Sequence, residues 1–414
     1  MTKQLITNAR LFIGVDDTVI DDGSVLVDGD RITWAGSTGE LPAVVSGDVE
    51  MLDVAGKFVM PGMTESHVHL SYSNAHPSQL DRQPIPTAML DAVDNARTLL
   101  GFGFTSAISF GSAQGIDVPL RTAIDSGRVP GPRLLASEKD LGSTGSNADS
   151  TSPESDGRKR IADGPWAVRA AVREVAKAGA DVVKIFLDGE ELSAHAAPGV
   201  LSYTDEEVAA ACEEAHERGL RVACHARSAR AVKQAVRYGV DFVGHANFLD
   251  DEAVDMLADA RDRLFVGPGI AWEIQLLERG HEIGLSRTAM EKRGYQREID
   301  ETISAVKRLR EVGVRLLIGG DYGLSITPHG TNAKDLEYFV DLFEMSTAEA
   351  LLCATRDGGL AADPTGMLGT LEAETAADLV IVDGDPIADI RVLQDADRIA
   401  AVMKAGVVDD RLLG

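Results

Sequence analysis

Eight short apolar runs of β-type residues, each followed by a helical pattern, constrain the fold of this chain more than any other feature. The runs are Met63 to Leu70, Phe104 to Phe110, Arg133 to Ser137, Val182 to Leu187, Arg221 to His225, Asp241 to His245, Leu264 to Gly267 and Arg315 to Asp321. Strands that alternate with helices in this way are typical of parallel βαβ units rather than hairpins. Eight such units predict a closed (β/α)₈ TIM barrel.

The two ends of the chain have a different pattern, in which short β-type runs alternate with turns. Asp28-Gly29-Asp30 separates two such runs near the start, and Asp383-Gly384-Asp385-Pro386 follows another, Ala377 to Val382. We expect the ends to pair into a small composite β-sandwich domain, built from residues 1–60 and 362–414. Residues 61–361 then form the barrel domain.

Composition limits the possible partners. The 414 residues carry a net charge of −26, which disfavours nucleic acid and anionic lipid, and no apolar stretch is long enough to span a membrane. Three cysteines without a short-spaced pair favour neither a disulfide framework nor a thiolate zinc cluster. We expect a cytoplasmic location, since the N-terminus lacks the apolar core of a secretory signal. We also expect a homo-oligomer that acts on a small molecule.

Histidines stand at the ends of three predicted strands. His67 and His69 flank Val68, so the alternation of a strand points both rings to the same side. His225 and His245 end the fifth and sixth runs and therefore face the same mouth of the barrel. Each histidine taken alone could equally be structural.

Lys184 and Asp321 are charged residues in apolar strands, where an unpaired charge is costly to bury. A buried neutral lysine amine can react with carbon dioxide to give a carbamate that bridges two metals, and an ion pair with an aspartate is the alternative. Asp321 follows a long apolar run and requires a metal or proton partner. Together with the four histidines, these residues supply nitrogen and oxygen ligands suited to a divalent ion, with Asp321 as proton shuttle to a metal-activated water.

The chain resembles the amidohydrolase superfamily over essentially its whole length. Val59 to Leu70 matches the first-strand signature of that superfamily, and Ala377 to Ile381 matches its last sheet strands. The resemblance implies two divalent ions, most consistent with Zn²⁺, although Mn²⁺ and Co²⁺ also suit the ligands. It implies that Lys184 is a carboxylated lysine (N6-carboxylysine) that bridges the ions. The expected ligands are His67, His69 and Asp321 for one ion, and His225 and His245 for the other.

Within the superfamily, Thr327 to Asn332 and Leu201 to Thr204 resemble a group of Xaa-Pro dipeptidases, aryl- and acyl-amide hydrolases and imidazolonepropionases. Two departures stand out. Gly142 to Asn147 lies where many dipeptidase relatives carry Gly-Gly-His, and Gly319-Gly320-Asp321 replaces the more usual Gly-Thr-Asp. Deaminase relatives place a glutamate where this chain has Ser228.

The predicted function is therefore metal-dependent hydrolysis of an amide-like C–N bond, in an amide, urea or carbamate of a small, aromatic or cyclic molecule. An Xaa-Pro dipeptidase, a deaminase or ring-opening hydrolase of a heterocycle, a decarboxylase and a non-catalytic scaffold are the alternatives. A scaffold is the least consistent of these, because it would have no need of a complete ligand set.

Several further residues are candidates for contact with substrate. Two long segments after strands, Glu138 to Gly164 and Ala271 to Gly294, are expected to be lid or substrate loops. The single candidates are His329, Arg227, Tyr72, Tyr203, His195 and Trp272. A salt bridge is the alternative for the arginine, packing for the aromatic residues, and a solvated loop for His195.

Overall fold

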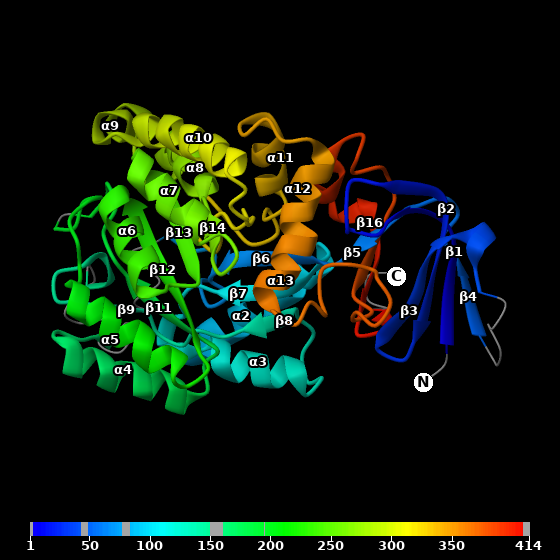
Figure 1. Cartoon of the computed structure of the whole chain (residues 1–414), viewed down its shortest axis with the longest axis horizontal. Helices are drawn as coiled ribbons and strands as arrows, with labels where there is room; N and C mark the ends of the chain where they lie inside the picture. Colours follow the sequence, from blue (N-terminus) through cyan, green and yellow to red (C-terminus); the bar gives the residue numbers. More distant parts are fainter. Residues whose placement is uncertain (1–2, 43–48, 77–82, 150–159, 194, 409–414) are drawn as a thin grey trace. The chain divides into compact units, whose positions relative to one another are not determined.

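The computed structural model describes residues 3–42, 49–76, 83–149, 160–193 and 195–408, and it divides into two compact units (Figure 1). Unit 1 consists of Met1–Glu65, Arg97–Ala107 and Ala333–Gly414. Unit 2 consists of Ser66–Ala96 and Ile108–Asn332. Two strands predicted for the barrel run across this division, so the proposed domain boundaries near residues 60 and 362 stay predictions.

Unit 1 contains an eight-stranded sheet within the described residues, in the order β17-β16-β15-β5-β1-β2-β3 with β4 beside β1. Its strands are β1 (Lys3–Phe12), β2 (Val19–Asp28), β3 (Arg31–Ser37), β4 (Val49–Asp53), β5 (Phe58–Pro61), β15 (Leu379–Val382), β16 (Ile399–Lys404) and β17 (Val407–Val408). β15 runs antiparallel to β5, with Val380 opposite Met60. The two ends of the chain therefore share one sheet, as the sequence predicts.

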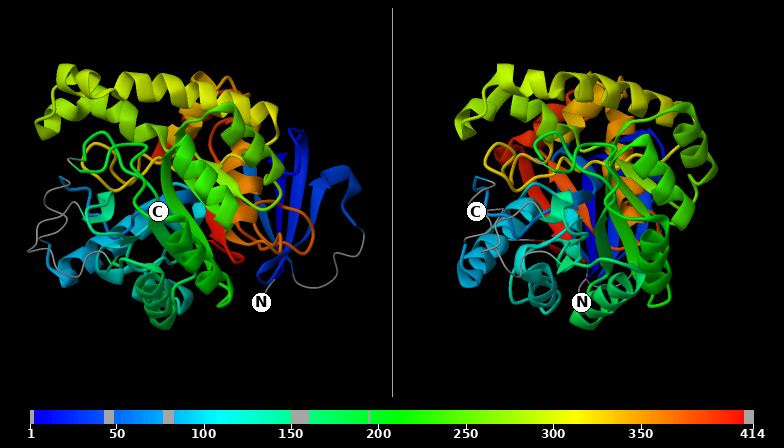
Figure 2. Two further views of the ribbon diagram at one scale, coloured as in Figure 1. Left: turned by 60° about the vertical axis from the view of Figure 1, so that its left-hand side comes forward. Right: turned by 90° about the vertical axis from the view of Figure 1, so that its left-hand side faces the viewer.

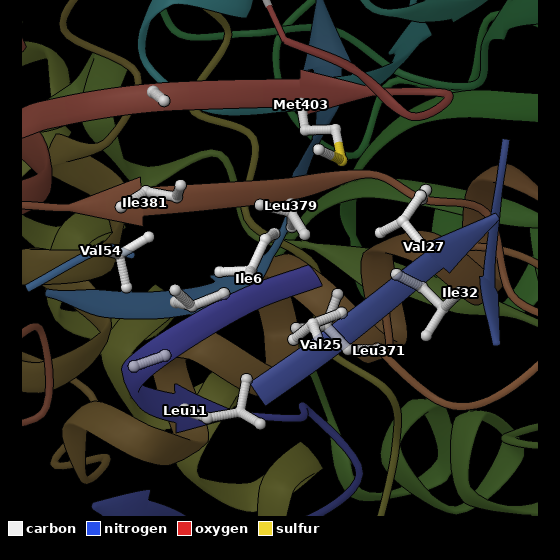
Figure 3. Close-up of a cluster of buried hydrophobic side chains, with 14 residues drawn as sticks. Ile6, Leu11, Val25, Val27, Ile32, Val54, Leu371, Leu379, Ile381 and Met403 are labelled. Carbon is white, nitrogen blue, oxygen red and sulfur yellow. The ribbon is translucent and has the colours of Figure 1, made fainter. Parts of the chain in front are cut away.

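The expected sandwich needs a correction, because the described strands form one continuous sheet rather than two. Buried side chains from opposite ends of that sheet, such as Ile32 and Met403, belong to the same apolar cluster (Figure 3). A flat sheet would keep these side chains apart. The sheet instead curls around one core, which buries an apolar face without a second sheet.

The barrel strands fall into two sheets, with order β6-β7-β8 in one and β10-β9-β11-β12-β13-β14 in the other. Their bounds are β6 (Met63–Val68), β7 (Phe104–Ser109), β8 (Arg133–Leu135), β9 (Leu141–Gly142), β10 (Arg160–Ile161), β11 (Val182–Phe186), β12 (Arg221–Ser228), β13 (Phe242–Phe248) and β14 (Phe265–Gly267). β11, β12, β13 and β14 pair in parallel, as expected for βαβ units.

The eighth predicted run differs from the other seven, because residues 315–321 form no continuous strand and make only an isolated bridge, between Leu316 and Val266. Backbone hydrogen bonds nevertheless join this segment and the two sheets in a ring: Val182 N to Ala136 O, Leu317 N to Val266 O, and Ser66 N to Ile318 O. Each of these bonds lies within unit 2. The connectivity is that of the predicted barrel, with a short and irregular eighth strand.

Helices follow the strands (Figure 1). They are α2 (Ile85–Gly101), α3 (Asp117–Asp125), α4 (Pro165–Ala178), α5 (Asp205–His216), α6 (Ala229–Tyr238), α7 (Asp251–Asp259), α8 (Ile270–Arg279), α9 (Arg287–Arg293), α10 (Tyr295–Glu311), α11 (Lys334–Asp341), α12 (Thr347–Leu352) and α13 (Gly358–Ala362). Local sequence explains several ends. A capping box between Thr204 and Glu207 begins α5, and Gly239 in a left-handed conformation ends α6.

The two predicted loops have different structures. The segment Ala271 to Gly294 is largely helical, since α8 and α9 occupy most of it and lead into α10, shown from yellow-green to yellow in Figure 2. The expectation of a loop was therefore wrong there. Glu138 to Gly164 contains the short strands β9 and β10, and residues 150–159 of it lie outside the described residues. Of the helices described, none has the length and apolar character needed to cross a membrane.

Candidate metal centre

One group of ligands forms around Asp321, at the end of the irregular eighth strand. His69 Nε2 lies 2.9 Å and His67 Nε2 3.7 Å from Asp321 Oδ1. His69 Nδ1 is 2.9 Å from the carbonyl oxygen of Gly111, a geometry in which Nδ1–H donates and Nε2 remains the acceptor. Such a bond from the second ring nitrogen orients a histidine for metal binding.

His225 and His245 form the second group, on the neighbouring parallel strands β12 and β13, which both continue beyond the histidine. Their ring centroids lie 4.4 Å apart with the rings edge to face. His225 Nε2 is 3.3 Å from the carbonyl oxygen of Gly189. Both ring nitrogens of His245 are buried and have no hydrogen-bond partner among the described residues, which is costly unless another group binds them.

The ligand group around Asp321 and the His225–His245 group lie next to each other. The ring of His245 is centred 5.3 Å from that of His67. One ligand atom each of His67, His245 and Asp321 can be chosen so that all three lie within 4.8 Å of one another. The structure therefore brings together strand ends far apart in the sequence, as the alternation of strands and helices predicted.

Burial sets the protonation of these ligands. It lowers the pKa of His67, His225 and His245 well below the usual value. Burial alone would raise the pKa of Asp321, but His67 and His69 lower it below its usual value. Neutral imidazoles beside an ionised carboxylate are the states that bind a metal ion.

Lys184 lies in the fully buried strand β11. Its Nζ is 4.7 Å from the ring centroid of Phe110 and 5.2 Å from that of Phe186. Phe110 also stacks on His67, with ring centroids 4.1 Å apart. These aromatic faces keep water from the amine, although carboxylation of Lys184 stays a prediction.

The backbone is strained at two ligands. His245 has φ 80° and Asp321 has φ 62°, and Ala246 next to His245 has φ 51°. Side chains other than glycine rarely adopt this left-handed region, at a cost of roughly 1–3 kcal/mol each, and such residues cluster at functional sites. The register between β12 and β13 also shifts here, between Ala226 and Ser228.

Two of the residues predicted to contact substrate lie against His69. The Tyr72 ring stacks on the His69 ring with centroids 4.4 Å apart and planes 7° from parallel. His329 Nε2 is 3.1 Å from the carbonyl oxygen of His69, and burial lowers the pKa of His329 to about 4. Both therefore border the ligand group, although their contact with substrate stays a prediction.

The other predicted substrate residues have different surroundings. Arg227 is buried in an ion-pair cluster with Glu273 and Glu298, which is the alternative considered from the sequence. Trp272 and Tyr203 are buried, at 4% and 2% exposure, and their contact with substrate stays a prediction. His195 is exposed in the segment between β11 and α5.

Sequence reasoning did not single out Phe110, Asn247, Glu273 and Glu298. A signal for two of them was present. Asn247 stands two residues after His245, the same spacing that places His67 and His69 on one side of their strand. Glu273 interrupts an apolar run at the start of α8.

The donor set fits a divalent ion. Three ligand atoms within 4.8 Å, the unpartnered nitrogens of His245 and the ionised Asp321 together match the nitrogen and oxygen ligands that such an ion takes.

Known proteins resemble this chain over nearly its whole length. Ochratoxinase of Aspergillus niger is 25% identical, with 98% of this chain and 86% of the relative aligned. Imidazolonepropionase of Rhizobium meliloti (strain 1021) is 23% identical, with 90% and 88% aligned.

Similarity extends to three dimensions. A crystal structure of a prolidase complexed with N-methylphosphonate-L-proline superimposes with a TM-score of 0.88 at 27% identity, and 98% of this chain and 99% of that one are covered. Such neighbours imply a TIM barrel with an additional domain. The model of the amidohydrolase family matches residues 58–408. The chain therefore belongs to the amidohydrolase family, a family of enzymes that act on C–N bonds.

Proposed function

We propose that the protein is a metal-dependent hydrolase that cleaves an amide-like C–N bond in a small, aromatic or cyclic molecule. The observation that carries the proposal is the buried cluster in which neutral histidines and an ionised aspartate converge from the strand ends. When bound at such a cluster, divalent ions activate water and polarise a carbonyl group.

The ligand set of the proposal has six members. It comprises His67, His69, Lys184, His225, His245 and Asp321, with Lys184 carboxylated and two ions bound, most consistently Zn²⁺. The convergence of the histidines and Asp321 supports this set. The aromatic contacts of Lys184 support a desolvated amine there.

Asp321 would move the proton. Its carboxylate is ionised, and it would take a proton from the attacking water and pass it to the leaving nitrogen. His69 Nε2 lies 2.9 Å from Oδ1, so the two atoms would be ligands of the same ion. His329 and Tyr72, which both border His69, are the residues best placed to contact the substrate group nearest this ion.

Relatives support a C–N bond as the target. The relatives named ochratoxinase and imidazolonepropionase are hydrolases, and each aligns with most of this chain. A flat substrate would suit the stacked rings of Tyr72 and His69.

An Xaa-Pro dipeptidase is the second candidate, because the prolidase structure superimposes so closely. The altered segment Gly142 to Asn147 weighs against ordinary dipeptide recognition. The choice between the two rests on substrate alone, since both would use the same ligands.

The experiment is a substrate panel with Zn²⁺- and Mn²⁺-loaded enzyme. It contains Xaa-Pro dipeptides, N-acyl amino acids, anilides, aryl ureas and amino-heterocycles, each assayed beside metal-stripped protein. We expect the highest kcat/KM for an aromatic amide or urea and none without metal. Preferred turnover of dipeptides would establish the peptidase, and equal activity after complete metal removal would refute both proposals.

A further inference from the structure

Two side chains that lie just beyond the ligands of β12 and β13 bind one another. Arg227 stands two residues after His225, and Asn247 two residues after His245. Arg227 Nη1 donates to Asn247 Oδ1 over 3.3 Å, and both residues are fully buried. A hydrogen bond thus joins the two strands next to the His225–His245 pair.

The same two side chains tie the strands to helices. Arg227 Nη1 also donates to Glu273 of α8, over 2.5 Å, and to Glu298 of α10. Asn247 Nδ2 donates to Thr302 Oγ1 of α10 over 2.7 Å. α8 and α10 therefore hold β12 and β13 through a cluster defined by Arg227, Asn247, Glu273, Glu298 and Thr302, here named the arginine cluster.

Stability alone does not account for the arginine cluster. Glu273 and Glu298 are both 0% exposed beside a single guanidinium. Taking three charged groups out of water costs more free energy than apolar side chains of similar size would, so buried ion pairs of this kind are weak evidence for stabilisation. Burial raises the pKa of Glu273 to about 8 in spite of the Arg227 charge, which reflects this cost.

The cluster coincides with the strained backbone at His245. Asn247 directly follows the two left-handed residues, His245 and Ala246. The His245 ring has no hydrogen bond to orient it among the described residues. Its position therefore depends on packing against the rings of His67 and His225 and on the backbone, which the Asn247 side chain joins to α10.

From this arrangement we infer that Arg227 and Asn247 are positioning residues for the metal centre. They fix the left-handed backbone at His245 and hold the His225–His245 pair in place for a metal ion, with α8 and α10 as the support. Arg227 acts through the ligands and not on substrate, since its side chain is 1% exposed and its Nη1 donates to Asn247, Glu273 and Glu298. The inference rests on the proposed function as a metal-dependent hydrolase.

Two variants test it. Asn247→Ala removes both bonds of Asn247 without leaving a charge, and Arg227→Lys keeps the charge but loses the planar guanidinium and its fixed donor geometry. Glu214→Gln is the matched control, because Glu214 of α5 is a buried carboxylate that accepts from Arg169 and Arg173 of α4, which belong to no ligand strand.

The measurements are metal content, affinity by competition with a chromophoric chelator, and the melting temperature of metal-free protein. Both test variants should bind one of the two ions about 10- to 100-fold more weakly, as is usual when a residue behind a ligand is removed. The other ion should keep its affinity within a few-fold. Glu214→Gln should lower the melting temperature with both affinities unchanged.

Equal loss of both ions, or affinities in Asn247→Ala that match the control, would overturn the inference. A crystal structure of metal-free Asn247→Ala separates this result from a failure of the proposed function. If wild-type protein binds one ion or none, the two-ion centre is wrong. The inference is then decided by the backbone: a relaxed His245 supports it, and a left-handed His245 refutes it.

Discussion

The sheet of unit 1 and the strand ends of unit 2 are both deeply buried, but they bury opposite kinds of side chain. The cluster in the sheet contains only apolar residues, and all four residues of β15 are buried. On the strands that carry the proposed ligands, His67, His245 and Lys184 are equally inaccessible, at 2%, 1% and 2% exposure.

The difference separates stability from function. Burial of apolar surface contributes roughly 25 cal/mol per Å², so the sheet stabilises itself. Buried polar side chains and left-handed backbone cost free energy. The ligands therefore keep their conformation only because the surrounding structure stabilises it. Substitutions in the sheet should therefore change stability, and substitutions at the strand ends should change metal binding and activity.

Lys184→Ala should have the largest effect on activity. Removal of the proposed bridging ligand should reduce metal content from two ions per chain to one or none and abolish hydrolysis, as elemental analysis and the substrate panel would measure. Lys177→Ala, at an exposed position of α4, is the control. Full metal content in Lys184→Ala would mean that Lys184 is an ordinary buried residue. Its burial would then serve stability, as burial does in the sheet of unit 1.

Asp321→Asn should keep the fold and lose turnover. Without an ionised carboxylate to move the proton, we expect kcat to fall by about 10²-fold or more. Steady-state kinetics beside metal analysis would distinguish loss of the proton acceptor from loss of an ion, and Asp255→Asn at an exposed position of α7 is the control. A kcat within a few-fold of wild type, with metals intact, would show that another group moves the proton.

The ligands could be predicted from the sequence because strand position follows from local pattern. Each histidine ends an apolar run, and parallel strands bring their ends to one face of a barrel. The pairing of β5 with β15 could be anticipated for the same reason, since both chain ends show short β-type runs.

The partners of Arg227 could not be predicted in that way. Glu273 and Glu298 reach it from two helices, 46 and 71 residues away in sequence, and no periodicity specifies which carboxylate faces which strand. The segment Ala271 to Gly294 was expected to be a loop because it follows the seventh predicted strand, but α8 begins directly after that strand. The curl of the sheet depends on contacts between distant strands and was missed for the same reason.

Leu379→Ala should destabilise the protein without affecting the chemistry. Leu379 lies in β15, is fully buried and belongs to the apolar cluster. Loss of its side chain should lower the free energy of unfolding by about 2–5 kcal/mol through lost burial and a cavity. Denaturant unfolding measures that change, and kcat/KM of the folded protein should stay within a few-fold of wild type. A tenfold loss of kcat/KM would show that the sheet also supports the site.

Arg287→Ala should have the smallest effect, and it tests the comparison with an exposed side chain instead of a buried one. Arg287 pairs with Glu291 on α9 over 2.8 Å, but its side chain is 61% exposed. Water already solvates both charges, so the pair should contribute about 0.5 kcal/mol or less, and even that should fall as salt increases. Denaturant unfolding at low and high salt would measure it. Arg227, by contrast, is 1% exposed, and its substitution should lower metal affinity. A stability loss in Arg287→Ala as large as that of Leu379→Ala would mean that burial does not determine what a side chain contributes here.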